Sequence, residues 1–514
     1  MGMLKFEQME TVQSDMGEKI RKMAIGKRKG KLAGIAGIGM MVFLGIGGRL
    51  LADSGTELPM ITVASVKVEQ ENFAGEEISH ALDEYVSPLI GAHVRLEFLE
   101  IERYAQIMNR YAASDVMPDV FLMLSNSSYR QWKEEGKMRN LSSLLEQYGQ
   151  GILNEVPEEY FGSYMEEREI YAIPCLNDRA HAFGFEYRKE IAKRYGLPME
   201  KVKQVSDLTE IFEMLKEKNP DMIACSNLYY SDWDVMGDGL GVLMGDGQNP
   251  EIVNLYETEE YQDYYRLLYL WEEEGYLLDE DIGYRSINNF VSSPEIFGKM
   301  AGYHPALLPI DSVDSGEDIG FIPLTPTVMR ETDLNGNAYG ISSSCQYPEA
   351  AMKFLNLMFS DPKVVNLLCY GIEGEHYQVI DHEKGIIDYA DGVTRRTSTY
   401  SQFRTYHWGN QHLAYVWKGF PEDVWEQEIQ YNDTAPRSLA NGFQFNPEPV
   451  QEEYGDCLSV TSRYLPLLEG REGHVESLLE EMTRQLNEAG IDRVIQEKQR
   501  QFDAYLEAKA NEKS

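Results

Sequence analysis

The loop from Gly371 to Tyr377 carries side chains well suited to chemistry in this 514-residue chain. It reads GIEGEHY and places a carboxylate, an imidazole and a phenol in direct succession. Polar loops of this composition serve function more often than packing. Their spacing matches neither a catalytic triad nor a metal motif. We therefore treat Glu375, His376 and Tyr377 as candidates for gripping a ligand rather than for catalysis.

Two more loops combine polar and aromatic side chains. The first, SNSSY from Ser125 to Tyr129, follows an apolar strand, and its hydroxyls and amide can hydrogen-bond the hydroxyls of a ligand. An equally good interpretation is that these residues cap the next helix. The second, NLYYSDWD from Asn227 to Asp234, sets two tyrosines and a tryptophan among acids and amides. Both loops are candidates for ligand contact.

Pairs of carboxylates raise the alternative of a secreted glycoside hydrolase. Asp232 or Asp234 could pair with Glu373 or Glu375. Hydrolysis needs two carboxyl groups about 5 to 9.5 Å apart across one bond. The chain holds 85 aspartates and glutamates, so acidic pairs arise easily by chance. This alternative therefore ranks below a binding function.

Neither a cofactor nor a metal ion is predicted. The five cysteines are odd in number and far apart, without C-x-x-C or zinc spacing, so we expect buried free thiols. The glycine-rich run from Gly237 to Gly247 matches neither a phosphate loop nor a dinucleotide fingerprint. The net charge of −38 argues against a nucleic-acid partner and suits a protein that works outside the cell or on a neutral ligand.

Residues 1–58 are predicted to be a basic cytoplasmic segment, a signal or anchor helix and a linker. A basic cluster ends at Lys31, and an apolar run with one arginine then extends to Ala52. This pattern is typical of export. Cleavage after Ala52 and retention of residues 32–52 as an anchor are both open, and we favour the anchor, with its basic side inside.

The body alternates strands and helices, which predicts right-handed βαβ units and parallel sheets. The chain leaves a first sheet near Ile173 and builds a second α/β unit. It then returns with a strand at Tyr339 and helices beginning at Pro348 and after Asp361. The predicted first lobe comprises residues 59–175 and 325–372. The predicted second lobe comprises residues 176–324 and 373–514, and two such lobes enclose a ligand cleft with the crossings as a hinge.

The ordered series of segments resembles the extracellular solute-binding proteins of ABC importers, in the carbohydrate-binding group. The resemblance covers most of residues 59–509, through DVFLMLSNS, REIYAIP, YETEEYQDYYRLLYLWEEEGYL, GKMAGYHPALLP and the stretch around Tyr339. From WGNQ through AGIDRVIQEKQRQFDAYL the chain is similar to the LipO-type subfamily and its DUF3502 domain. The resemblance implies an α/β, two-lobe, periplasmic-binding-protein-like II fold with hinge crossings and a helical C-terminal region.

The resemblance also implies a non-enzymatic function. Such proteins bind a sugar or oligosaccharide between their lobes, as monomers at the outer face of the membrane, and present it to ABC permease subunits. Sugars stack on aromatic rings and hydrogen-bond planar polar groups. The expected ligand-binding residues are Ser125, Asn126, Asp178, Arg179, Tyr230, Trp233, Tyr303, His304, Glu375, His376, Tyr377, Trp408, Asn410 and Gln411.

One departure from the family keeps a further alternative open. Many members carry a lipid-modified cysteine near the start, and this chain has no cysteine there. Attachment to the membrane would then depend on residues 32–52. An anchored solute receptor that signals to a partner is therefore the alternative to an importer subunit.

Overall fold

The computed structural model describes residues 58–67, 72–124, 126–166, 169–228, 230–278, 289–330, 337–400 and 405–512. The predicted anchor at residues 32–52 and the candidate Ser125 lie outside this part, as does the side chain of Asn126. None of the described helices is both long enough and apolar enough to cross a membrane. Residues from Leu58 onward form one compact unit.

The first lobe is built on a five-stranded sheet in the order β2-β1-β3-β13-β6. Its strands are β1 (Met60–Lys67), β2 (His93–Glu100), β3 (Val120–Met123), β13 (Ala338–Ile341) and β6 (Ala172–Pro174). β1 is parallel to β2 and β3, whereas β13 lies antiparallel between β3 and β6. The predicted return of the chain to this sheet at Tyr339 is therefore confirmed.

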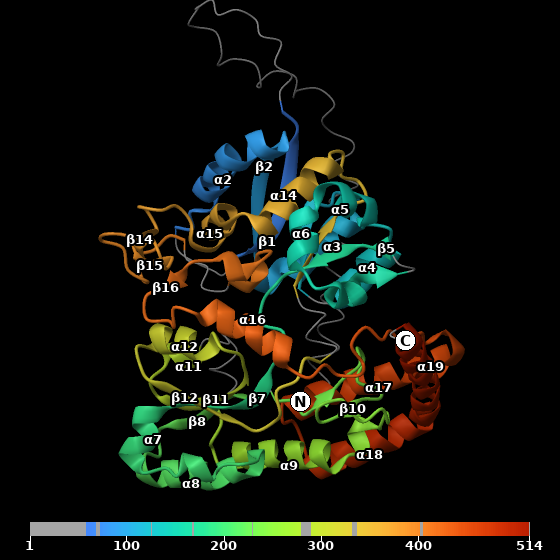
Figure 1. Cartoon of the computed structure of the whole chain (residues 1–514). Coiled ribbons are helices and arrows are strands. Elements are labelled where there is room, and N and C mark those ends of the chain that lie inside the picture. The colour runs from blue at the N-terminus through green and yellow to red at the C-terminus, as the bar shows by residue number, and fades with distance from the viewer. Residues whose placement is uncertain are drawn as a thin grey trace, which may run out of the picture. The chain divides into compact units, whose positions relative to one another are not determined.

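Helices pack around this sheet (Figure 1). They are α2 (Gly75–Ile90), α3 (Tyr104–Ala113), α4 (Asn126–Glu134), α5 (Ser142–Tyr148), α6 (Gln150–Glu155), α14 (Pro348–Ser360) and α15 (Pro362–Tyr370). α14 begins at Pro348 as predicted, because a proline at the first helical position loses no hydrogen bond. Asp361 caps α15 by accepting from the backbone N–H groups of Lys363 and Val364.

The second lobe is built on a four-stranded sheet in the order β12-β7-β11-β8. The strands are β7 (Ala182–Arg188), β8 (Ile223–Leu228), β11 (Ile296–Tyr303) and β12 (Ile319–Pro323). Its helices are α7 (Lys189–Tyr195), α8 (Leu208–Lys218), α9 (Glu259–Glu273), α11 (Asn289–Ser292), α12 (Leu307–Ser315), α17 (Gln451–Glu469), α18 (Val475–Ala489) and α19 (Ile491–Glu512). Side chains of α17, α18 and α19 enter the core of this lobe.

The chain leaves the first lobe later than the sequence predicts. β14 (Tyr377–Asp381), β15 (Ile386–Tyr389) and β16 (Val416–Trp417) form a small sheet of their own. Tyr377, Ile387, Trp408 and Trp425 belong to the same hydrophobic core as the first sheet. The sequence pattern places all of residues 373–514 in the second lobe. The large aromatic side chains of 377–425 instead bury their apolar area against the first core.

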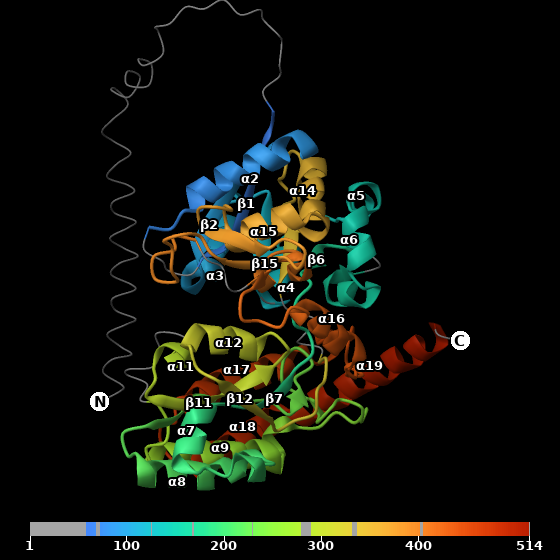
Figure 2. The same ribbon diagram turned by 60° about the vertical axis from the view of Figure 1, so that its left-hand side comes forward.

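Within the described part of the chain, three crossings link the two lobes. The hinge, as the term is used below, consists of residues 175–181, 324–330 and 435–439 of these crossings. His181 and Val328 exchange two backbone hydrogen bonds of 3.0 Å. Met329 donates to the carbonyl of Pro436 at 2.9 Å, and Ser438 donates back to Met329 at 2.9 Å. α16 (Val424–Thr434) precedes the third crossing and lies between the two lobes in Figures 1 and 2.

Candidate functional site

Asp178, His304 and Glu428, called the hinge clamp below, meet where the crossings lie. Asp178 belongs to the first crossing, His304 follows the last residue of β11, and Glu428 lies on α16. Glu428 is fully buried because it lies one helical turn after the buried Val424, on the same face of α16. His304 keeps 15% of its side chain exposed and Asp178 keeps 22%.

His304 lies between the two carboxylates of the hinge clamp. Its Nδ1 is 3.0 Å from Oε2 of Glu428, and its Nε2 is 3.9 Å from Oδ2 of Asp178. Burial lowers the pKa of His304, but the two carboxylates outweigh this effect and leave the pKa above its usual value. Burial opposes ionisation of Asp178, yet His304 and His181 lower its pKa overall. Both shifts act in the direction of an imidazolium at His304 beside an ionised Asp178.

One ligand atom from each residue of the hinge clamp lies within 4.8 Å of the ligand atoms of the other two, so a metal ion is the obvious alternative. A metal would need the three side chains to point at one centre. The two ring nitrogens of His304 instead face different carboxylates, and one imidazole cannot offer both nitrogens to one ion. The arrangement therefore fits a protonated imidazole between two carboxylates better than it fits a metal centre.

Three further predicted residues hold the hinge together. The guanidinium of Arg179 donates to the carbonyl of Cys175 and lies 5.5 Å from the ring centroid of Tyr160. Gln411 donates to Oε1 of Glu428 at 2.5 Å. Asn410 is buried, and its side chain accepts from the backbone N–H of His412 at 3.1 Å. These side chains use their polar atoms inside the protein.

The edge of the second sheet that adjoins the hinge carries a different group: Tyr230, Asp232 and Tyr303, called the second-lobe edge below. β8 and β11 are parallel neighbours with Leu228 opposite Met300, so residues 230–232 and Tyr303 follow the carboxyl ends of the two strands at the same edge of the sheet. In α/β sheets, ligands bind beyond such strand ends. The ring of Tyr230 lies 5.4 Å from that of Tyr264, and burial raises the pKa of Tyr230 to about 12.

Asp232 is the polar centre of the second-lobe edge. Its Oδ1 is shielded from solvent and has no hydrogen-bond partner among the described residues. Burial raises the pKa of Asp232, and the nearby charge of Arg330 opposes this change. Arg330 lies in the second crossing and is itself buried, with its guanidinium 5.3 Å from the ring centroid of Phe183. A carboxylate oxygen in this state can accept a hydrogen bond from a ligand hydroxyl.

The remaining predicted residues belong to neither group. Trp233 packs in the second core, and Trp408 packs in the first, 6.2 Å from the ring of Phe98. His376 is buried, where its Nδ1 accepts from the backbone N–H of Ile372 at 3.1 Å and burial lowers its pKa. Tyr377 is buried against Tyr370, and Glu375 is exposed.

The GIEGEHY loop thus has a structural explanation. Gly371 adopts a φ of +86°, and an added Cβ would lie 3.0 Å from the His376 ring. A side chain there would be strained in its backbone and crowded by the imidazole. The imidazole serves to close the turn, so the loop does not gather three free polar groups as the sequence suggests.

Sequence reasoning missed Glu428, His181 and Arg330, and it considered Asp232 only as a hydrolase acid. One signal was available for Glu428. Val424, Glu428 and Asn432 recur every fourth residue on one face of α16, and all three are buried. A charged residue in an otherwise buried stripe indicates a partner of opposite charge, although it does not say which one.

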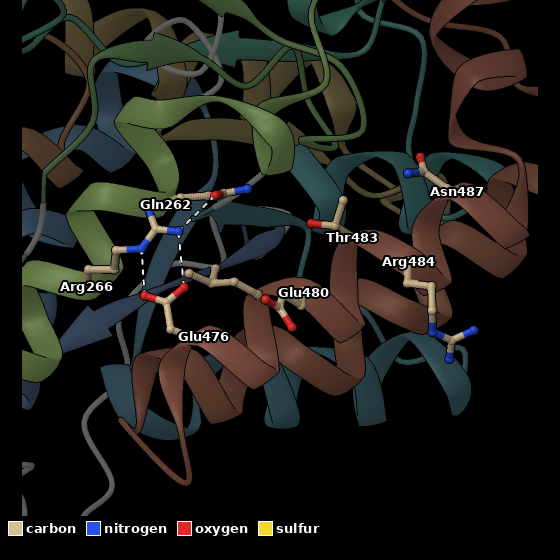
Figure 3. Close-up of a pocket in the computed structure, with 8 residues that line it drawn as sticks. Gln262, Arg266, Glu476, Glu480, Thr483, Arg484 and Asn487 are labelled. Atoms are coloured by element: carbon tan, nitrogen blue, oxygen red, sulfur yellow. Dashed lines mark hydrogen bonds and ion pairs between the residues drawn. The ribbon is translucent and has the colours of Figure 1, made fainter.

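A surface cavity of about 430 Å³ lies between α9 and α18, away from both groups (Figure 3). Arg266 crosses it to Glu476, with contacts of 2.8 and 3.2 Å, and also donates to Gln262 at 3.2 Å. Arg484 pairs with Glu481 and Glu488 on its own helix. Since these charges are already paired with one another, the cavity is a poor candidate for a ligand site.

Comparison with known proteins identifies the class. The family model of bacterial extracellular solute-binding proteins matches residues 91–364, more than half of the chain, and a domain of unknown function, DUF3502, matches residues 439–507. The chain belongs to the bacterial extracellular solute-binding protein family. The resemblance found in the sequence is thereby confirmed, including the similarity of the C-terminal part to DUF3502.

Individual relatives point in the same direction. A carbohydrate ABC transporter substrate-binding protein of Streptococcus pneumoniae is 22% identical over 89% of this chain and 93% of its own length. The N-glycan transport solute-binding protein of S. pneumoniae, solved with Man1GlcNAc, has a TM-score of 0.75 at 20% identity over 87% of this chain and all of its own. The FusA protein of S. pneumoniae, solved with kestose, has a TM-score of 0.61 at 14% identity, over 88% of this chain and all of its own. The predicted two-lobe fold with a helical C-terminal region is confirmed.

Proposed function

We propose that this protein binds a neutral saccharide between its two lobes and presents it to the permease of an ABC importer, without catalysing a reaction. The observation that carries the proposal is the second-lobe edge, where a half-buried tyrosine accompanies a carboxylate oxygen that lacks a partner among the described residues. An aromatic face beside a hydrogen-bond acceptor is the combination that recognises a sugar ring.

The charge of the site argues for a neutral rather than an acidic saccharide. Asp232 lies beside one buried arginine, and the whole chain carries a net charge of −38. A uronate would bring a second carboxylate into a desolvated site, where like charges repel strongly. Related proteins of known structure bind Man1GlcNAc and kestose, which are useful first ligands to try.

We assign contacts on both lobes. Tyr230, Asp232 and Tyr303 come from the second lobe, and Ser125 and Asn126, which follow β3, come from the first. Asp178, Arg179, His304, Asn410 and Gln411 support the ligand through the hinge rather than by direct contact. Trp233, Trp408, His376 and Tyr377 stabilise the cores.

Calorimetry of the full-length chain tests the proposal. We expect binding of a neutral oligosaccharide from a panel that includes Man1GlcNAc, kestose and an alginate oligosaccharide. Binding of peptides and of no saccharide would refute the sugar assignment, and binding of alginate alone would refute the preference for neutral ligands. Release of reducing sugar that Glu375→Gln abolishes would point to a hydrolase instead.

We further propose that the protein is a monomer at the outer face of the membrane, retained by residues 32–52. Fractionation of cells that express the full chain tests the anchor, because a cleaved form would appear in the medium. Co-purification with two permease subunits would support transport, whereas recovery with a signalling protein and no permease would favour a receptor.

A further inference from the structure

The hinge clamp connects segments that belong to different lobes. Glu428 lies on α16, whose Val424 and Trp425 pack in the first core. His304 directly follows β11 of the second sheet, and Asp178 lies in the first crossing. Rotation of one lobe about the hinge therefore changes the distance between the side chains of Glu428 and His304 unless α16 moves with the second lobe.

We propose that the hinge clamp fixes the angle between the two lobes, with the protonated ring of His304 connecting α16 to the carboxyl end of β11. Loss of that proton removes the charged contact between α16 and β11, leaves the ring contact of Tyr431 with Tyr303, and allows a wider range of interlobe angles. This device goes beyond saccharide binding and does not depend on which ligand the protein takes.

Hydrogen bonding explains why the proton matters. A neutral imidazole has one N–H group, so it can donate to only one of two carboxylates. The other carboxylate would then face a ring nitrogen lone pair. Only the imidazolium can donate a hydrogen bond to Glu428 at 3.0 Å and at the same time present a positively charged N–H to Asp178, 3.9 Å away. The fully buried Glu428 would otherwise lack a cationic partner in the hinge clamp.

The groups around His304 favour this state. His181 from the first crossing lies 3.1 Å from Asp178, with its ring 6.1 Å from that of His304. His412, after Gln411, is also close to Glu428, but burial lowers its pKa and so favours the neutral ring. Arg179 directs its guanidinium to Cys175 and Tyr160. His304 therefore supplies the positive charge between the two carboxylates.

The other carboxylate oxygen of Glu428 also has a defined partner, which fixes the orientation of the side chain toward His304. Its Oε1 accepts from Gln411, whose own Oε1 accepts from the hydroxyl of Thr405 at 3.0 Å. Asn432, one turn further along α16, donates to the carbonyl of Asn177 at 2.8 Å and accepts from the N–H groups of Arg179 and Ala180 at 3.0 Å. α16 is thus fixed to the first crossing by neutral hydrogen bonds. It also packs on β11 through the rings of Tyr431 and Tyr303, whose centroids are 5.7 Å apart, and the pair of Glu428 with His304 is the contact that titrates.

The test measures the distance between the lobes without ligand. Val116→Cys in the first lobe and Leu270→Cys on α9 give exposed labelling sites, 65% and 41% exposed in the native residues, while the five native cysteines are buried. Energy transfer between two dyes is recorded on the full-length chain from about pH 5.5 to about pH 9. We expect a narrow distribution at low pH that widens about twofold as His304 loses its proton.

Variants separate the clamp from general effects of pH. Glu428→Gln and His304→Gln should give the wide distribution at every pH, whereas His382→Gln, on an exposed histidine, should behave like the parent protein. If the distribution of interlobe distances in the parent protein does not change with pH, the proposal is overturned, even if both clamp variants fail to fold. A distribution that narrows at high pH with added Zn²⁺ and widens with chelator overturns it as well, in favour of a metal site.

Discussion

Two carboxylates near the crossings, Glu428 and Asp232, differ in what their oxygens contact. Glu428 is fully buried, and both oxygens have partners within the chain, His304 and Gln411. Asp232 is partly buried, and its Oδ1 lacks a partner among the described residues. A carboxylate that the protein satisfies by itself positions the structure, whereas one left unsatisfied in a shielded place is available to a ligand. The following predictions test this contrast.

Glu428→Ala should cause the largest change, and it should be a change in stability. Removing one partner of a buried ion pair typically costs about 3–5 kcal/mol of unfolding free energy, and here it leaves His304 with Asp178 alone, 3.9 Å away. Urea unfolding followed by tryptophan fluorescence measures this loss. A loss below about 1 kcal/mol would show that His304 does not depend on Glu428.

Asp232→Asn should change binding and leave stability nearly intact. Hydrogen bonds to charged groups contribute about 1.5–3 kcal/mol, so saccharide affinity should fall about 10- to 150-fold. The amide keeps the shape of the side chain, and Oδ1 of Asp232 has no hydrogen-bond partner among the described residues that the substitution could remove. Calorimetry and thermal unfolding measure the two quantities.

A matched control sharpens this second result. Asp221→Asn alters an exposed aspartate of the same lobe, shortly before β8, and should change neither affinity nor stability. If Asp232→Asn lowers stability by as much as Glu428→Ala, the two carboxylates have the same function and the contrast fails.

Stability should depend on pH through the hinge clamp in a defined direction. The pKa of His304 is raised in the folded state above its ordinary value of 6.5. Its contribution is therefore fully present below about pH 6.5 and is lost as pH rises through the folded pKa, with a slope of at most about 1.4 kcal/mol for each pH unit. Unfolding of the parent protein and of His304→Gln should differ most at low pH and converge at high pH. Divergence with rising pH would contradict the imidazolium.

Glu375→Gln should have the smallest effect. Glu375 is exposed, and substitutions at such positions usually change stability by less than about 0.5 kcal/mol. Saccharide affinity should also be unchanged, because the neighbouring His376 and Tyr377 are buried in the first lobe. A tenfold loss of affinity would bring the GIEGEHY loop back as a ligand contact.

The order and type of the main elements followed from the sequence. Strand and helix patterns predicted two α/β units, the return at Tyr339 and the helix starts at Pro348 and after Asp361. These features depend on neighbouring residues: a proline at a first helical turn, an aspartate cap, and apolar side chains at helical spacing. Local rules of this kind act within one element, so one sequence suffices to apply them.

Which polar residues meet was decided only by the tertiary structure. Asp178 and Glu428 lie 250 positions apart, and no local pattern links them. The composition of GIEGEHY suggested a ligand loop, yet packing turns its imidazole and phenol inward. The sequence by itself determined the class of protein and the arrangement of its elements. The folded chain alone determined that His304 lies between two carboxylates and that Asp232 keeps one oxygen without a partner among the described residues, because both depend on long-range packing.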